Sequence, residues 1–505
     1  MSAVLFTVAL VAIIIYLVYY YFTKNFNHWK DRGVTGPQPK LFFGNFKGAI
    51  TEKRNFGYEI DDIYKSYKKT DDFVGVFSAT TPQLLILNPE LVKKIQITDF
   101  SSFADNEASQ WTDGNYDDLM ISEHPFVLKG AEWKEKRAEL LPSLTPAKIK
   151  SYYPVIKSVC SKLTNHIQDN EQEYKNCVDA TDLLTKFTGE VMCDIVWGLQ
   201  AGAFTTKDDS GFMKMSHKLV GDFFTALGRY LTSTSFPILK WFMNIQFVKK
   251  DTADFFRNLS KLAIESRMNG KERNDFLQFM INLQDKKHIT HDQFVSRQLI
   301  FVFDGIDTTA VIATHILLFV ARDKAIQRRL RQIISETAEE DGFMDCDVLQ
   351  NLTFLDNIVN ESLRIFTPVA TGLSKYCTKP YHYIGDNGKA LTLKPKDLVV
   401  LPTYSFHMDS DYYDEPEKFK PDRFNEENGG VKKFKDAGVF FPFGAGPRIC
   451  IGMKIAIILC KAAIVELVRN FDIEVHEKTR KDNLCDPTSV IMKLDGGIHL
   501  KLKSL

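Results

Sequence analysis

FGAGPRICIG, residues 443–452, is a glycine-rich loop with one cysteine, and it directly precedes an apolar stretch with helical spacing at residues 453–468. Glycine permits a tight backbone path in such a loop. A helix N-terminus offers free amide donors and the positive end of the helix dipole, and both favour a thiolate at Cys450. Arg448 adds a cation that could pair with an anionic group. The pattern therefore predicts a loop whose sulfur binds a soft metal such as iron.

Two other interpretations apply to this loop. A dinucleotide-binding fingerprint would need a third glycine where Ile449 stands, and a preceding strand of a βαβ unit. A buried, inert cysteine that packs as a small hydrophobe is the plainer alternative. The eight cysteines include no CxxC pair, so neither a zinc site nor a disulfide framework is indicated, and a reducing compartment is expected.

The overall composition is that of an ordinary folded protein. Of 505 residues, 44% are apolar and 25% are charged, which excludes a mostly disordered or fibrous chain. Lys plus Arg and Asp plus Glu both number 64, so the net charge gives no support for nucleic-acid binding. No internal repeat or composition break divides the chain, so one large domain is expected.

The N-terminus carries a candidate membrane span at residues 3–22, which has no charged residue and is long enough to cross about 30 Å of hydrocarbon. Tyrosines crowd its end, and basic residues follow, which is typical of an uncleaved anchor with a cytosolic body. A cleaved signal peptide and a buried core helix are the alternatives. We expect a membrane anchor at 1–23, a basic and proline-rich hinge at 24–39 and a catalytic domain at 40–505.

The remaining pattern is mainly helical with a smaller β portion. Residues 73–77 and 83–87 read as a β-hairpin, and residues 367–401 gather extended and turn signals. Residues 291–322 carry apolar side chains at helical spacing, with Gly305 as a potential breaker, and predict one very long helix through the centre of the molecule.

The cysteine loop resembles the haem-ligand signature F-x-x-G-x-R-x-C-x-G of the cytochrome P450 family at all five fixed positions. The resemblance implies the cytochrome P450 fold, with haem b (iron protoporphyrin IX) between a long central helix and the cysteine-ligand loop. It makes Cys450 the iron ligand and places the rest of the signature at the cofactor. The matching residues are Phe443, Gly446, Arg448, Cys450 and Gly452.

Three further motifs are similar to those of the family. Glu361 and Arg364 match its E-x-x-R helix, with Arg423 as the third partner of a structural core; alone, such an i, i+3 pair would more often be solvated. Trp133 and Arg137 match a W-x-x-x-R pair that contacts a haem propionate, although the spacing alone also fits an amphipathic surface turn.

The segment DGIDTT, residues 304–309, resembles the family's distal helix motif, which assigns a proton relay to Asp307 and Thr308. A mid-helix threonine that bonds the i−4 carbonyl is the ordinary alternative. Asp304 stands where the family usually has Ala or Gly. It either enters the proton path or binds a polar group of the substrate, or it points aside and bonds a neighbouring helix. Where the family usually has a propionate-binding arginine, the local cation in this chain is Lys375. Its ammonium lacks the bidentate fork of a guanidinium, so we expect it to contact a propionate as a point charge.

The implied activity is that of a microsomal haem-thiolate monooxygenase of the insect and vertebrate xenobiotic-metabolising clan. It would insert one atom of dioxygen into lipophilic small molecules, either xenobiotics or endogenous lipids and hormones. The chain has no nicotinamide-binding or iron–sulfur motif, so electrons would come from a separate NADPH-cytochrome P450 reductase, with cytochrome b5 as a second donor. The expected location is the endoplasmic reticulum membrane. An isomerase or dehydratase of the same family and a haem sensor or electron carrier are the alternatives.

Two sets of residues are expected to contact partners. A basic face for an acidic reductase would use Lys134, Lys136, Arg137, Lys432, Lys433, Lys435 and Lys454. Substrate contacts are expected, by resemblance to the family topology, from residues 103–126, 223–242, 369–373 and 488–492. Within the second of these segments, residues 236–239 with Trp241 and Phe242 would dip into the membrane or pack in the core.

Overall fold

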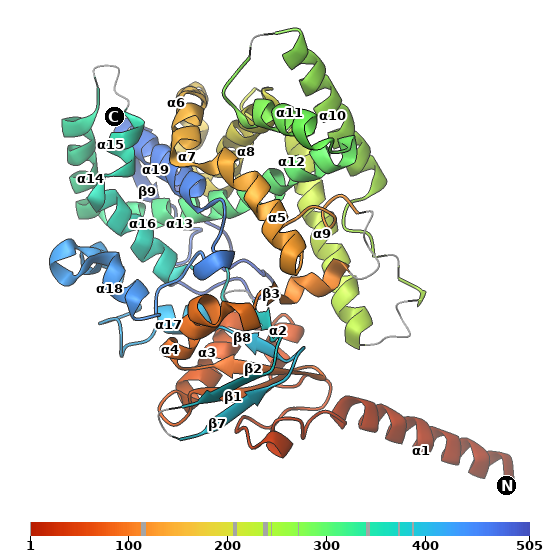
Figure 1. Cartoon of the computed structure of the whole chain (residues 1–505). Helices are drawn as coiled ribbons and strands as arrows, with labels where there is room; N and C mark the ends of the chain where they lie inside the picture. The colour runs from red at the N-terminus through yellow and green to blue at the C-terminus, as the bar shows by residue number, and fades with distance from the viewer. Residues whose placement is uncertain are drawn as a thin grey trace.

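A helical part and a β-rich part lie next to each other in the computed structural model (Figure 1). It describes residues 2–112, 118–205, 210–235, 241–243, 245–270, 272–339, 344–371, 374–385 and 388–505. The longer helices are α1 (Ser2–Thr23), α3 (Phe56–Tyr67), α5 (Gly130–Leu140), α6 (Pro146–Asp169), α8 (Ala180–Trp197), α9 (Gly211–Ser235), α10 (Lys250–Met268), α11 (Phe276–Lys287), α12 (His291–Gly305), α13 (Asp307–Arg322), α14 (Lys324–Thr337), α16 (Thr353–Ile365) and α19 (Met453–Asn470). The shorter ones are α2 (Lys47–Ile50), α4 (Pro89–Lys93), α7 (Glu171–Asn176), α15 (Cys346–Gln350), α17 (Thr403–His407) and α18 (Gly430–Asp436). The predicted mainly α architecture is confirmed.

The described residues form three small sheets. The largest has the order β1-β2-β8-β5-β3, and β1 pairs with β2 in the antiparallel register Phe73 opposite Ile86. The predicted hairpin is therefore confirmed. Residues 367–401, where extended structure was expected, contain the four strands β5 to β8. The strands are β1 (Phe73–Ser78), β2 (Thr81–Ile86), β3 (Asp105–Asn106), β4 (Val178–Asp179), β5 (Lys375–Tyr376), β6 (Tyr381–Ile384), β7 (Ala390–Leu393), β8 (Leu398–Val400), β9 (Phe471–Val475) and β10 (His499–Ser504).

The predicted single helix at 291–322 is wrong in one respect, because it consists of α12 and α13, separated at Ile306. Ile306 has φ −81° and ψ −71°, and its carbonyl accepts a hydrogen bond of 3.1 Å from the hydroxyl of Thr188 on α8. A donor from outside the helix thus takes part of the carbonyl's hydrogen-bonding capacity at the break. Helical periodicity cannot reveal this contact, since its partner lies on another helix.

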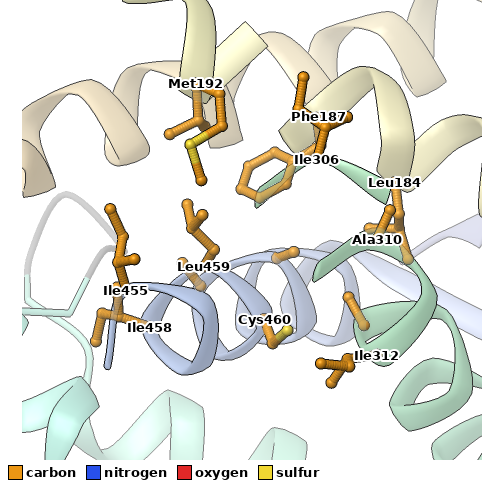
Figure 2. Packing of buried hydrophobic residues seen from close by; sticks show 14 of the residues in the cluster. Leu184, Phe187, Met192, Ile306, Ala310, Ile312, Ile455, Ile458, Leu459 and Cys460 are labelled. Atoms are coloured by element: carbon orange, nitrogen blue, oxygen red, sulfur yellow. The ribbon is translucent and has the colours of Figure 1, made fainter. Parts of the chain in front are cut away.

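Helix α13 packs in the centre of the helical part. Its side chains are buried from Thr309 to Ala321, and they lie among apolar side chains of α8 and α19 (Figure 2). Ala310 and Ile312 face this core together with Leu184 of α8 and Leu459 of α19. The packing fixes the position of the α12–α13 break relative to the start of α19, which is where the cysteine loop ends.

The N-terminal helix α1 extends away from the body, and its side chains are exposed almost throughout (Figure 1). The segment that follows α1 packs against the β-rich part. Trp29 is buried against β1, where its Nε1 donates to the carbonyl of Val76 at 3.3 Å, and the Gly75 amide donates to the carbonyl of Thr35 at 2.8 Å. Packing against the body begins even earlier, at Phe22, which is buried with its ring 4.7 Å from that of Phe42 between centroids, so it precedes the expected domain start at residue 40.

Two hydrophobic clusters form the interior. The helical core contains buried side chains of α6, α8, α12, α13, α16 and α19, and the β-rich core contains those of β1, β2 and residues 377–441. The chain passes from the β-rich core to the helical core between Phe103 and Ala108, returns between Ala370 and Cys377, and passes to the helical core again between Phe441 and Ile455. The cysteine loop therefore lies where the two cores meet.

Candidate active site

Cys450 lies just before α19, and its amide donates a hydrogen bond of 2.9 Å to the carbonyl of Phe443. Burial raises the pKa of the Cys450 thiol to about 11, and the charge of Asp304 raises it further. The amides of Gly452 and Met453, which bond the sulfur, oppose these effects. The two amides thus act in the predicted direction, and Cys450 is exposed on the surface of the protein. A bound metal cation would reverse the balance.

Glycines shape the loop around the sulfur. Gly446 has φ +67°, and a Cβ added there would lie 1.9 Å from the carbonyl oxygen of Gln96. The side-chain oxygen of Gln96 accepts from the amide of Ala445 at 2.9 Å. At Gly452 an added Cβ would meet Ile455 at 4.0 Å. Cys450 itself is exposed, so the protein leaves free the space next to the sulfur, as a flat cofactor would require.

Arg448 connects the loop to the segment before α5. Its guanidinium donates to the carbonyls of Ala104, Pro125 and Leu128 at 2.8, 2.7 and 2.9 Å. It also lies over the ring of Trp133, with its central carbon 4.0 Å from the ring centroid. Burial lowers the pKa of Arg448 to about 9, although Asp105 partly opposes the shift.

Two more cations lie near Arg448. The ammonium of Lys375 donates to Oδ1 of Asn106, and burial together with the charge of Arg448 lowers its pKa to about 7. Nη2 of Arg137 donates to the carbonyl of Ile449 at 2.6 Å, and burial lowers the pKa of this side chain too. Arg137, rather than Arg448, is the cation that lowers the pKa of Cys450.

These residues fit an iron porphyrin. Two buried cations and the half-buried Arg137, all with lowered pKa values, favour an anionic group beside them, and the two propionates of haem would supply that charge. In the described part of the chain, Nε1 of Trp133 has no hydrogen-bond partner, so it is available as a further donor. Cys450 supplies a soft sulfur ligand next to the space left by Gly452.

The residues expected to relay protons lie at the break between α12 and α13. The hydroxyl of Thr308 donates to the carbonyl of Asp304, the i−4 bond that a packing threonine would also make. Asp307 is the first residue of α13, and burial raises the pKa of its carboxyl, whereas His217 and Lys493 lower it. The structure thus places an acid and a hydroxyl at the break.

His124 lies in the segment 103–126 from which substrate contacts were expected, but its pairing with Asp304 was not predicted. Its Nε2 lies 3.3 Å from Oδ2 of Asp304, although the two residues are 180 positions apart in the chain. Asp304 therefore contacts the segment before α5 and not a neighbouring helix, and half of its side chain is exposed. No spacing or periodicity could have identified this contact.

Glu361, Arg364 and Arg423 come together in the interior. Arg364 donates to both carboxylate oxygens of Glu361 at 2.8 Å, and Nε of Arg423 donates to the same carboxylate at 3.0 Å. Glu361 and Arg364 are fully buried, and Tyr413 lies beneath both guanidinium groups. The pair is therefore not the solvated surface pair that its spacing alone would suggest.

Comparison with known proteins identifies the fold family. The family model described as cytochrome P450 matches residues 34–502. The chain belongs to the cytochrome P450 family. It is 40% identical over 494 residues to a probable cytochrome P450 28d1 of Drosophila melanogaster, covering 97% of each chain. It is 37% identical to a probable cytochrome P450 28a5 of the same fly, with 99% of this chain and 100% of the relative covered. Cytochrome P450 6a2, also from this fly, is 29% identical, with 97% of each chain covered.

Family membership makes the chain a haem-dependent monooxygenase, since the cytochromes P450 are such enzymes, and they generally use redox partners and lipophilic substrates. The expected cytochrome P450 fold is thereby confirmed. The relatives are insect cytochromes P450, which agrees with the group suggested by the sequence. Helix α1, whose span Ala3–Thr23 has a mean hydropathy of 2.5, is compatible with a membrane anchor.

The expected docking cations of this P450 differ in their surroundings. Lys136 is not a free surface cation, because it pairs with Glu123 at 3.1 Å and Glu139 at 3.9 Å. Arg137 faces the cysteine loop. The side chains of the remaining docking candidates are exposed, and these are Lys134, Lys432, Lys433, Lys435 and Lys454.

The expected substrate segments are described only in part. Residues 113–117, 236–240 and 372–373 lie outside the described residues. Trp241 and Phe242 are 88% and 82% exposed, so they do not pack in the core. Around the α12–α13 break, the described part of these segments contributes aromatic side chains, including Trp111, Phe126 and Phe223.

Proposed function

We propose that this cytochrome P450 inserts one atom of dioxygen into lipophilic small molecules, with electrons that reach it from NADPH through a separate reductase. The observation that carries the proposal is the cysteine loop, in which two amides are directed at the Cys450 sulfur while Arg448 of the same loop anchors a buried group of cations. This arrangement suits a thiolate-ligated haem with paired propionates.

Haem b would be held by residues of the cysteine loop and by residues of α5 and β5. Cys450 would bind the iron, and Gly452 and Phe443 would shape the adjacent backbone. Arg448, Lys375, Trp133 and Arg137 would hold the propionates. Thiolate-ligated haem supplies the activation of dioxygen for insertion into a substrate.

Asp307 and Thr308 would move protons at the α12–α13 break. Burial raises the pKa of the Asp307 carboxyl, which favours its protonated form and makes it a candidate proton donor. The hydroxyl of Thr308 can accept a proton from Asp307 while it donates onward, because a hydroxyl is both donor and acceptor. Glu361, Arg364 and Arg423 have a structural role, since they bond one another and the backbone.

We also propose that α1 anchors the enzyme in the endoplasmic reticulum membrane with its body in the cytosol. The basic residues after the apolar span favour this orientation. NADPH-cytochrome P450 reductase would dock on the exposed lysines, and cytochrome b5 is a second candidate donor. Xenobiotics or endogenous lipids and hormones are the candidate substrates.

A carbon monoxide difference spectrum of the purified full chain tests the proposal first. A thiolate-type Soret band that is lost in Cys450→Ala would support it, and the absence of bound haem would contradict it. Incubation with reductase, NADPH and dioxygen then separates the alternatives. Reductase-dependent consumption of substrate supports a monooxygenase, whereas turnover of peroxides without reductase would indicate an isomerase or dehydratase. Bound haem with no turnover would indicate a sensor or electron carrier.

A further inference from the structure

His124 and Asp304 form a polar pair in aromatic surroundings. The ring of His124 lies 6.2 Å from that of Phe126 and 6.4 Å from that of Phe303 between centroids. Phe303 in turn contacts Phe223 of α9, with centroids 4.3 Å apart. The Asp304 carboxylate adds nothing to the packing of these aromatic side chains, so its presence there calls for a polar partner.

The segment that carries His124 is held on both sides. Glu123 accepts from Nε and Nη2 of Arg297 on α12 at 3.1 and 3.0 Å and pairs with Lys136 of α5. The carbonyl of Pro125 accepts from Arg448 of the cysteine loop. His124 is therefore fixed between the distal helix and the cysteine loop, and its position does not depend on its contact with Asp304.

The imidazole presents one nitrogen to Asp304. Nδ1 of His124 accepts from the amide of Phe126 at 3.1 Å, so the proton of the neutral ring is on Nε2. That nitrogen is buried and makes no aligned hydrogen bond within the described residues, while Oδ2 of Asp304 lies 3.3 Å away. The histidine is 5% exposed, whereas the Asp304 side chain is 50% exposed. The ring can thus position the carboxylate while one of its oxygens faces outward.

We propose that Asp304, positioned by His124, binds a hydrogen-bond donor on the substrate, and that the preferred substrates are lipophilic molecules that carry a protonated amine. This rests on the proposed function and adds a substrate class to it. A carboxylate only accepts hydrogen bonds, so it selects donors and repels anions. A protonated amine gains a charge-assisted bond, which is about twice as strong as a neutral one, while the aromatic side chains contact the rest of the molecule.

Binding of three matched probes to the haem-loaded full chain tests the assignment. N,N-dimethyl-2-phenylethylamine is protonated at neutral pH, 2-methyl-4-phenylbutan-2-ol carries a hydroxyl, and isopentylbenzene has the same shape without a donor. Calorimetry gives each dissociation constant, and the Soret spectrum shows whether the amine has bound the iron instead. We expect the amine to bind most tightly.

Asp304→Asn keeps the shape of the side chain and removes its charge. It should weaken amine binding by about tenfold or more, weaken alcohol binding less, and leave binding of the hydrocarbon unchanged.

His124→Asn keeps a side-chain oxygen that can accept from the amide of Phe126 but lacks Nε2. It should weaken amine binding by about threefold. Asp292→Asn, in the first turn of α12 and paired with Arg257 at the surface, is the matched control and should change none of the three constants.

Unchanged amine binding in Asp304→Asn would overturn the proposal. Equal losses for all three probes would also overturn it, because they would show a packing role, and a loss confined to the alcohol would exclude the amine class. If the chain instead fails to bind haem or to give a thiolate spectrum, the proposed function fails. The two failures are therefore distinguishable.

Discussion

Arg364 donates hydrogen bonds of 2.8 Å to both carboxylate oxygens of Glu361, and neither side chain is exposed to solvent. Arg423 and the amide of Lys420 complete the environment of that carboxylate. Removal of one charge from such a group leaves the others buried without compensation, which costs far more than a surface pair contributes.

Glu361→Gln should therefore lower the free energy of unfolding by about 3–5 kcal/mol, measured by urea titration of the haem-loaded protein. If the variant does not fold, we expect a loss of haem-containing protein on expression, for the same reason. Asp62→Asn removes a carboxylate from the exposed pair with Arg54 and is the control, with little change expected. Equal behaviour of the two variants would contradict a structural role for Glu361.

The two glycines that flank Cys450 should respond differently to alanine. Gly446→Ala places a Cβ against the Gln96 carbonyl at a positive φ, so it should lower the free energy of unfolding by more than about 2 kcal/mol. Gly452→Ala meets no such obstacle in the protein. It should leave the polypeptide stable and reduce haem content, measured by absorbance per mole of protein. A normal haem content in Gly452→Ala would argue against the placement of the cofactor.

The hydroxyl at position 308 should matter for coupling and not for haem binding. Thr308→Ala removes the proton donor at the helix break, so product formed per NADPH consumed should fall about tenfold or more. Thr308→Ser retains the hydroxyl and should keep most of the coupling. Both should retain the carbon monoxide spectrum, and equal coupling in both variants would exclude the relay.

His315 should contribute to acid sensitivity. Its Nδ1 bonds the carbonyl of Val311 and its Nε2 accepts from the amide of Leu494, so the neutral ring is required, and burial lowers its pKa to about 4. The unfolded state therefore binds a proton that the folded state does not as pH falls below about 6.5. Between pH 7.5 and 5 this should cost about 2 kcal/mol of stability. His315→Gln should show a correspondingly smaller loss in urea titrations at the two pH values, and an equal loss would contradict this.

Charge reversal at the exposed docking candidates tests the reductase surface. Lys134→Glu combined with Lys433→Glu should slow the first electron transfer several-fold at low salt, with a smaller effect at high salt, because the attraction is screened. Stopped-flow reduction under carbon monoxide measures this rate. Lys175→Glu on α7, an exposed lysine outside the proposed face, controls for net charge. The same slowing in the control would exclude a specific surface.

Local patterns predicted much of this fold and site. The hairpin at β1 and β2 and the start of α19 follow from spacings of a few residues, which fix the geometry of turns and helix faces, whereas the structural role of the Glu361–Arg364 pair followed from the resemblance to the family. The contact between His124 and Asp304 spans 180 positions and was not predictable. Lys136 was expected to be a free surface cation. Its ion pair with Glu123 could not be predicted either, because it forms only when the chain has folded. The break at Ile306 depends on Thr188, which lies on another helix.

Arg448 bonds residues on both sides of the boundary between the helical core and the β-rich core. Before the cofactor arrives, this boundary holds mutually repelling cations, and it is the place where the two halves would separate most readily. Newly made chains that wait for cofactor should therefore be cut by proteases near residues 104–107, beside the Ala104 carbonyl that Arg448 binds. The supply of cofactor in the cell, more than the packing of either half, would then set how much of the enzyme survives to maturity.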